Sequence, residues 1–250
     1  MNKHQTIFQR HLSRHLAVAF TSGRLLYLGP IAVALLWAAM AQAATPDNVE
    51  QIVAQGNGRG APACITCHGT RGEGSSAFPR LAGTGEAYLQ AQLDAFSSGA
   101  RKNSTMQTIT KQLSTTERSE IAAYYSKLAS PRISLPSATP PPTDVGAWIA
   151  NRGRWSDDLP ACVQCHGRGG RGVGQQFPPL AGLPSAYIAE QLQAWRSGTR
   201  PPGPLGLMAT IASKLSAGDS HAVADYYGGQ STANPVMAGG TPLRKPENRL

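Results

Sequence analysis

Apolar residues recur three and four positions apart over residues 88–96 and 121–128 of the chain. The same spacing returns in the second half over residues 187–195 and at Tyr226 and Tyr227. This spacing places apolar side chains on one face of a helix, whereas a half-buried strand alternates apolar and polar residues. The pattern therefore predicts an all-α fold built from amphipathic helices.

Residues that favour helix starts mark the boundaries of these elements. Ser114 and Glu117 have the spacing of a capping box, and Ser216 and Asp219 repeat that pairing. In such a box the two side chains satisfy free backbone N–H groups at a helix N-terminus. A further helix is predicted to start at residues 45–47, where a proline and an acid follow a threonine.

The two halves of the sequence repeat one another. Cys162 follows Cys64 by 98 residues, and Met208 follows Met106 by 102, because the second copy has extra residues in the run Pro201-Pro-Gly-Pro204. Two similar helical domains are therefore expected. The predicted division is a signal peptide over 1–43, a first domain over 44–130, a proline-rich linker over 131–143, a second domain over 144–230 and a disordered tail over 231–250.

Both copies carry the pattern C-x-x-C-H, as Cys64-Ile-Thr-Cys67-His68 and Cys162-Val-Gln-Cys165-His166, and these runs contain every cysteine of the chain. The pattern is the attachment signature of c-type haem, in which the two thiols form thioethers and the adjacent histidine binds the iron. Two intervening residues let one turn present both sulfurs to the same porphyrin edge. We expect two covalently bound haem c groups per chain.

Other uses of paired cysteines explain the pattern less well. A zinc ribbon places its two C-x-x-C pairs about 15 to 20 residues apart, far closer than these. A thiol redox site gives no reason for a histidine after the second cysteine in both copies. An exported protein could form disulfides, but all four cysteines are already committed to the haem signature. Haem attachment accounts for both runs in full.

Each haem iron needs a second axial ligand opposite its histidine unless it stays open for catalysis. Outside the leader and the haem motifs, the only histidine is His221, and the only methionine besides Met106 and Met208 lies in the tail. Met106 and Met208 follow His68 and His166 by 38 and 42 residues, in what we predict to be a polar loop between two helices. We expect both as iron ligands, and His221 as a surface residue.

The leader and the charge indicate where the chain works. Residues 1–24 carry four basic residues and no acid, and an apolar run over 25–40 ends in Ala41-Gln42-Ala43. This predicts a secretory signal cleaved after Ala43 and export to the periplasm, with an uncleaved membrane tether as the alternative. The full chain has 23 basic and 14 acidic residues, a net charge of +9. Removing the leader removes four basic residues and no acid, so the net charge falls to +5. Such a surface could bind an acidic partner or associate peripherally with an anionic membrane, or it could be a solvated surface with no binding role. The Gly- and Arg-rich run over 167–172 follows a haem motif, where a tight loop is needed, so no nucleic-acid partner is expected.

Together these motifs resemble the cytochrome c4 family of di-haem proteins, which have two class I cytochrome c domains in tandem. The resemblance covers essentially the whole mature chain, through both C-x-x-C-H-G motifs, the Phe-Pro-x-Leu-Ala-Gly loops, the Tyr-x-x-x-Gln-Leu helices and Gly-x-Arg before each methionine. It implies that the Pro79 and Pro178 carbonyls accept a hydrogen bond from the proximal histidines. It also implies that Leu81 and Leu180 pack against the haem faces.

The resemblance implies an electron-transfer protein rather than an enzyme. A quinol-oxidising complex or a dehydrogenase would be the donor and a terminal oxidase the acceptor, and the number of chains in the assembly stays open. The alternative is a di-haem redox enzyme of the peroxidase or thiosulfate-oxidising type, or a cytochrome subunit dedicated to one. An enzyme needs an exchangeable iron site, and two matched methionines argue against that. The proline insertion before Met208 departs from the first copy and puts the equivalence of the two haems in doubt.

Overall fold

The computed structural model describes residues 48–133, 140–230 and 232–233. The predicted leader lies outside the described residues, as does most of the predicted tail. The described chain is helical, as the sequence pattern predicts, and both repeats belong to the same compact unit. Among the described residues, no helix is both long and apolar enough to cross a membrane.

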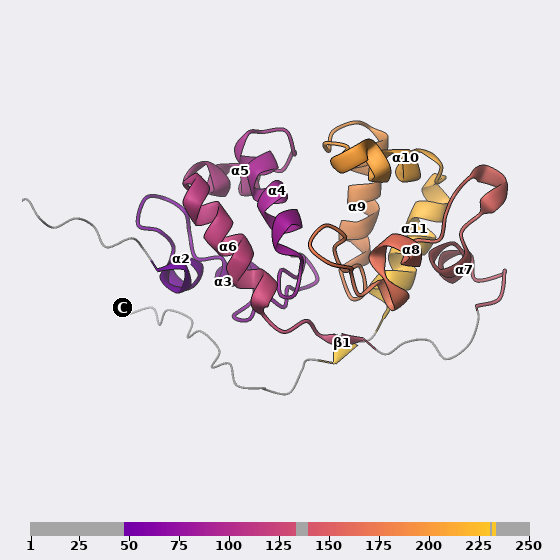
Figure 1. Cartoon of the computed structure of the whole chain (residues 1–250), viewed down its shortest axis with the longest axis horizontal. Helices are drawn as coiled ribbons and strands as arrows, with labels where there is room; N and C mark the ends of the chain where they lie inside the picture. Colours follow the sequence, from indigo (N-terminus) through magenta and orange to yellow (C-terminus); the bar gives the residue numbers. More distant parts are fainter. Residues whose placement is uncertain (1–47, 134–139, 231, 234–250) are drawn as a thin grey trace, which may run out of the picture. The chain divides into compact units, whose positions relative to one another are not determined.

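The first repeat packs its helices around one apolar cluster (Figure 1). Its elements are α2 (Val49–Gln55), α3 (Ile65–His68), α4 (Glu86–Ser97), α5 (Ser104–Lys111) and α6 (Thr115–Lys127). Helix α4 packs against α5 and α6, and α2 packs against α6. Ile52, Val53, Ile121 and Tyr125 are almost completely buried between these helices. The apolar faces predicted from residue spacing therefore form the core.

The second repeat has the same order of helices with short 3₁₀ turns added. Its elements are α7 (Val145–Arg152), η1 (Trp155–Asp157), α8 (Val163–His166), η2 (Arg168–Gly170), α9 (Ser185–Arg196), η3 (Pro204–Gly206), α10 (Leu207–Ser213) and α11 (Ala217–Gly228). Helix α11 packs against α7 and α9, and α10 packs against α9. Ile149, Leu159 and Tyr227 are fully buried at the centre.

The predicted capping boxes are present at both last helices. Ser114 accepts a hydrogen bond from the backbone N–H of Glu117, whose carboxylate accepts one from Ser114 N–H. Ser216 and Asp219 make the same reciprocal pair at α11. Helix α2 has Asn48 as its N-cap, which is later than the predicted start at 45–47. The Asn48 side chain caps the helix by accepting a hydrogen bond from the backbone N–H of Glu50 at 3.1 Å.

One departure from an all-α chain lies at the ends of the repeats. Residues of β1 (Arg132–Ile133) pair antiparallel with β2 (Thr232–Ala233). Strand β1 lies in the predicted linker and β2 in the predicted tail, and neither segment was expected to have regular structure. Strands of two residues lack any periodicity, so apolar spacing cannot reveal them. The remaining tail, 234–250, lies outside the described residues.

Candidate haem-binding sites

Each C-x-x-C-H run forms a single helical turn. In α3, His68 N–H donates to Cys64 O at 3.0 Å, and in α8, His166 N–H donates to Cys162 O at 2.9 Å. Residues three and four positions apart share one side of a helix. The turn therefore presents both thiols and the imidazole of a motif on the same side. Glycine then ends each turn with a positive φ, 84° at Gly69 and 77° at Gly167.

The two histidines have the same fixed orientation. His68 Nδ1 donates to Pro79 O at 2.8 Å, and His166 Nδ1 donates to Pro178 O at 2.8 Å. Because a carbonyl only accepts, this contact places the proton on Nδ1 and leaves the Nε2 lone pair for a metal. Both rings are buried, and burial lowers their pKa despite the proline contact. A neutral, preoriented imidazole is the form that binds iron.

No disulfide joins any of the four cysteines, and the first cysteine of each motif packs against the apolar cluster of its repeat. Burial raises the pKa of Cys64 and of Cys162 to about 11, so each sulfur is favoured in its uncharged form. A thioether is likewise uncharged and suits the same apolar surroundings. The buried hydroxyls of Tyr125 and Tyr227 lie beside these thiols. In both repeats, then, the first sulfur of the motif is buried against the apolar cluster.

The Phe-Pro-x-Leu-Ala-Gly loops are held by matching backbone contacts. In the first repeat, Leu81 N–H donates to Gly72 O at 2.8 Å, and Gly83 N–H donates to Tyr125 O at 3.0 Å. A side chain at Gly72 would collide with the ring of Tyr125. Glycine there lets the loop lie directly against the last helix, which fixes the carbonyl that orients His68.

The second repeat reproduces that loop. Leu180 N–H donates to Gly170 O at 2.8 Å, Gly182 N–H donates to Tyr227 O at 2.8 Å, and a side chain at Gly170 would collide with the Tyr227 ring. Leu180, with Cys162, packs against the buried cluster of its repeat. Leu81 and Cys64 do the same in the first repeat. The loop thus brings the predicted leucine and the first cysteine of each motif to the same apolar cluster.

The two predicted methionine ligands lie on helices and not in the predicted loops. Met106 is half-buried on the first turn of α5, because Asn103 caps that helix and accepts from Met106 N–H at 2.9 Å. Met208 is half-buried on the first turn of α10 and packs against the cluster that also contacts Cys162. The polar composition predicted a loop, since cap residues and short helices leave little apolar periodicity.

The start of α10 shows the effect of the proline insertion. No side chain caps this helix, and the preceding 3₁₀ turn has Leu205 at a positive φ of 58°. Leu205 is 92% exposed. A non-glycine residue in the left-handed region is strained, so Met208 is positioned by a less regular segment than Met106 is.

An arginine of the first repeat contacts the second, which the sequence reasoning did not foresee. Arg101 donates to Gln92 Oε1 at 3.0 Å, to Tyr187 Oη at 3.1 Å and to Gln191 Oε1 at 2.7 Å. Its guanidinium lies over the Phe96 ring, 4.4 Å from the centroid. Arg101 is therefore buried by partners from both repeats.

Arg200 makes the reciprocal set of contacts. It donates to Gln191 Oε1 at 3.0 Å, to Tyr88 Oη at 2.8 Å and to Gln92 Oε1 at 3.1 Å. Its guanidinium lies 3.8 Å from the centre of the Trp195 ring. The signal was present in the sequence, because the tyrosine, glutamine and arginine recur at equivalent positions of both copies. The repeat alone does not reveal that each arginine contacts side chains of the other repeat.

The site geometry defines a class of protein. In each of two helical repeats, one turn carries two thiols and an oriented imidazole, a proline loop fixes that imidazole, and an apolar cluster meets the first thiol. These donors fit a covalently attached haem, and they define a c-type cytochrome with two class I domains.

Comparison with known proteins agrees with this class. The family model for cytochrome c matches residues 40–129. A thiosulfate dehydrogenase electron acceptor from Thiomonas intermedia is 42% identical over 206 residues, covering 79% of this chain and 87% of that protein. Cytochrome c4 from Pseudomonas aeruginosa is 36% identical, covering 68% of this chain and 84% of the relative. The chain belongs to the cytochrome c4 family.

One solved structure places a similar sequence inside a longer chain. The thiosulfate dehydrogenase TsdBA from Marichromatium purpuratum matches with a TM-score of 0.66 and 38% identity. The match covers 75% of this chain and 40% of that chain. The relatives from T. intermedia and P. aeruginosa are electron-transfer cytochromes and not catalytic subunits. This protein is accordingly a di-haem electron carrier with two covalently bound haem c groups that exchanges electrons with a redox partner.

Proposed function

We propose that this chain accepts electrons from a thiosulfate-oxidising enzyme and passes them to a respiratory acceptor. The observation that carries the proposal is the relative named as a thiosulfate dehydrogenase electron acceptor, which is 42% identical over most of both chains. The cytochrome c4 from P. aeruginosa is less similar, at 36%. The TsdBA structure supports the same partner, since there the similar region is part of a thiosulfate dehydrogenase chain.

The ligand set that we propose follows from the donors. Cys64 and Cys67 hold one haem, with His68 and Met106 as its axial ligands. Cys162 and Cys165 hold the other, with His166 and Met208. A haem with these ligands supplies reversible one-electron chemistry at iron. The prediction of the methionines rests on their equivalent positions in the two repeats.

The protein's own residues suit that chemistry to carrying electrons. The Pro79 and Pro178 carbonyls hold both imidazoles in one orientation, and this restraint would limit reorganisation on electron transfer. Apolar packing by Leu81, Leu180 and the buried helices keeps water away and disfavours the additional charge of the oxidised site. Two axial side chains per iron leave no exchangeable position, so the site favours transfer over catalysis.

Stopped-flow mixing under anaerobic conditions tests the donor. The oxidised protein is mixed with purified thiosulfate dehydrogenase and thiosulfate, and haem reduction is followed by its visible absorption. We expect rapid reduction that requires both enzyme and thiosulfate, with each omitted in turn as controls. Reduction by a quinol-oxidising complex but not by thiosulfate dehydrogenase would overturn the proposal. That result would favour the general carrier that feeds a terminal oxidase, the role expected from the resemblance to cytochrome c4.

We also propose that the chain works in the periplasm after removal of residues 1–43. The proposal rests on the basic start, the apolar run and Ala41-Gln42-Ala43 in the sequence. Intact mass measurement of protein purified from the periplasmic fraction tests it. The expected mass is that of residues 44–250 with two haems. A full-length mass in the membrane fraction would show an uncleaved anchor.

A further inference from the structure

Arg80 is a buried cation that faces no counter-charge among the described residues. It directly follows Pro79, whose carbonyl orients His68, and only 5% of its surface is exposed. Its Nη1 donates to Ala181 O at 3.1 Å, in the matching loop of the second repeat. Its Nε and Nη2 have no hydrogen-bond partner among the described residues. Two of the three nitrogens of a buried guanidinium thus lack a partner among the described residues.

That arrangement requires an anion. Arginine keeps its charge in proteins, and burying the charge unpaired is strongly unfavourable. Burial lowers the pKa of Arg80, and no carboxylate among the residues that the structure describes offsets the loss of water. The two unsatisfied nitrogens lie on one edge of the guanidinium, and that edge matches the two oxygens of a carboxylate. A carboxylate or a similar oxyanion is therefore the missing partner.

We propose that Arg80 Nε and Nη2 bind a propionate of a haem. Each haem c carries two propionate carboxylates, and Arg80 lies where the two histidine-orienting loops meet through Ala181. The bound propionate would satisfy the buried charge and join one haem to the contact between the repeats. The inference depends on the haems and not on which enzyme supplies electrons.

The second repeat has no arginine at this position. Pro179 stands where the first repeat has Arg80, and proline has neither charge nor N–H. One guanidinium therefore serves one haem preferentially. A positive charge near a haem favours the reduced state, because oxidation adds positive charge to the site. Arg80 should raise the reduction potential of one haem above its value without the charge.

Redox titration of the holoprotein tests the proposal at mildly alkaline pH, where carboxylates are ionised. Arg80→Gln should lower one of the two potentials and leave the other nearly unchanged, and Arg80→Lys should lower it less. The matched control is Arg118→Gln, because Arg118 is an arginine of the same repeat that pairs with Asp94. This control removes the same charge but should move neither potential as much. Equal shifts in Arg80→Gln and Arg118→Gln would overturn the proposal.

Two further measurements separate a propionate from a free anion and do not need a stable glutamine variant. Resonance Raman spectra of the wild-type protein and Arg80→Lys should differ in the propionate bending mode of one haem. Adding phosphate or thiosulfate at constant ionic strength should leave the wild-type potentials unchanged. Identical propionate modes would overturn the propionate assignment, and potentials that follow the added anion would show that Arg80 binds a free anion instead.

Discussion

The first and second repeats hold their haem motifs identically but stabilise the surrounding helices differently. Helix α7 has Gly146 facing α11, where a side chain would collide with Ala222 O. The aligned position of α2 is Val49, which is half-buried against the first cluster. Glycine disfavours a helix, but here it permits close packing of two helices. In the second repeat the first helix therefore packs by close approach of two backbones, whereas in the first repeat it packs through the Val49 side chain.

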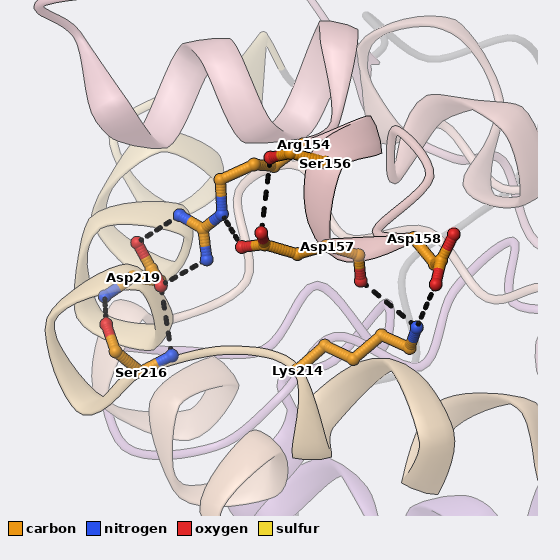
Figure 2. A network of polar contacts seen from close by, with 7 residues as sticks. All are labelled: Arg154, Ser156, Asp157, Asp158, Lys214, Ser216 and Asp219. Carbon is orange, nitrogen blue, oxygen red and sulfur yellow. Dashed lines mark hydrogen bonds and ion pairs between the residues drawn. The ribbon is translucent and has the colours of Figure 1, made fainter.

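A second contrast lies at the last helices. Figure 2 shows Arg154 reaching Asp219 of the capping box in the second repeat, with Asp157 and Lys214 beside it. In the first repeat, Glu117 accepts from Asn57, which aligns with Arg154, and from Arg59, whose side chain is 57% exposed. The repeats thus conserve what orients the iron ligands and vary what anchors the last helix. Two similar haem sites can therefore be supported by helices that differ in how firmly they are anchored.

The largest expected effect comes from the methionines. Met106→Ala and Met208→Ala should each abolish the methionine-to-iron charge-transfer absorption of one haem and lower one potential, because a thioether favours the reduced iron. Visible spectroscopy and redox titration measure this. Because the start of α10 is less regular, the decrease in reduction potential should differ between Met106→Ala and Met208→Ala. An unchanged absorption in either variant would refute that ligand.

Next comes the contact between α7 and α11. Gly146→Val should destabilise the second repeat by about 3 kcal/mol, since the added side chain must displace Ala222 or the whole helix. The reciprocal Val49→Gly should cost the first repeat about 1 kcal/mol through propensity and lost burial. Urea denaturation followed by circular dichroism gives both values. Equal losses would mean that the two helix pairs pack alike.

Removal of the capping acids should have a smaller effect. Asp219→Ala should cost about 2 kcal/mol, since it breaks hydrogen bonds to a charged group and the cap together. Glu117→Ala should cost about 1 kcal/mol because its arginine partner is largely exposed. Hydrogen bonds from Arg154 hold the pKa of Asp219 well below its usual range. The contribution of Asp219 is therefore complete above about pH 4 and is lost as the pH falls further.

The pH dependence provides the check on this pair. Denaturation midpoints of wild-type protein and Asp219→Ala should differ most at neutral pH and converge in acid. The control is Asp94→Ala, which removes an acid of the first repeat outside any capping box. A constant gap between wild-type protein and Asp219→Ala down to strongly acid pH would contradict the ionic role of Asp219.

The smallest effect is expected at the aromatic rings under the reciprocal arginines. Trp195 Nε1 donates to Pro201 O at 3.0 Å, a contact that phenylalanine lacks. Trp195→Phe should cost about 1 kcal/mol through that hydrogen bond and a weaker ring interaction with Arg200. Thermal denaturation of wild-type protein and Trp195→Phe measures this cost. Equal midpoints would show that the proline insertion contributes no stability through Trp195.

The parts of this molecule that follow local rules could be predicted from the sequence. Residue spacing gave the long helices, Ser114 and Ser216 gave the caps, and the resemblance gave the proline contacts to both histidines. The helices that carry Met106 and Met208 were missed because they are short and polar. Contacts between the repeats, such as that of Arg80 with Ala181, depend on tertiary packing that periodicity does not encode.

The pairing of β1 with β2 has a consequence for how such proteins can be assembled. The chain enters and leaves the second repeat at strands that are hydrogen-bonded to each other. A segment whose two ends meet can be duplicated, or joined to another protein, without redirecting the chain on either side. The same closure makes the second repeat a modular unit, to which a further redox domain could be added at either end.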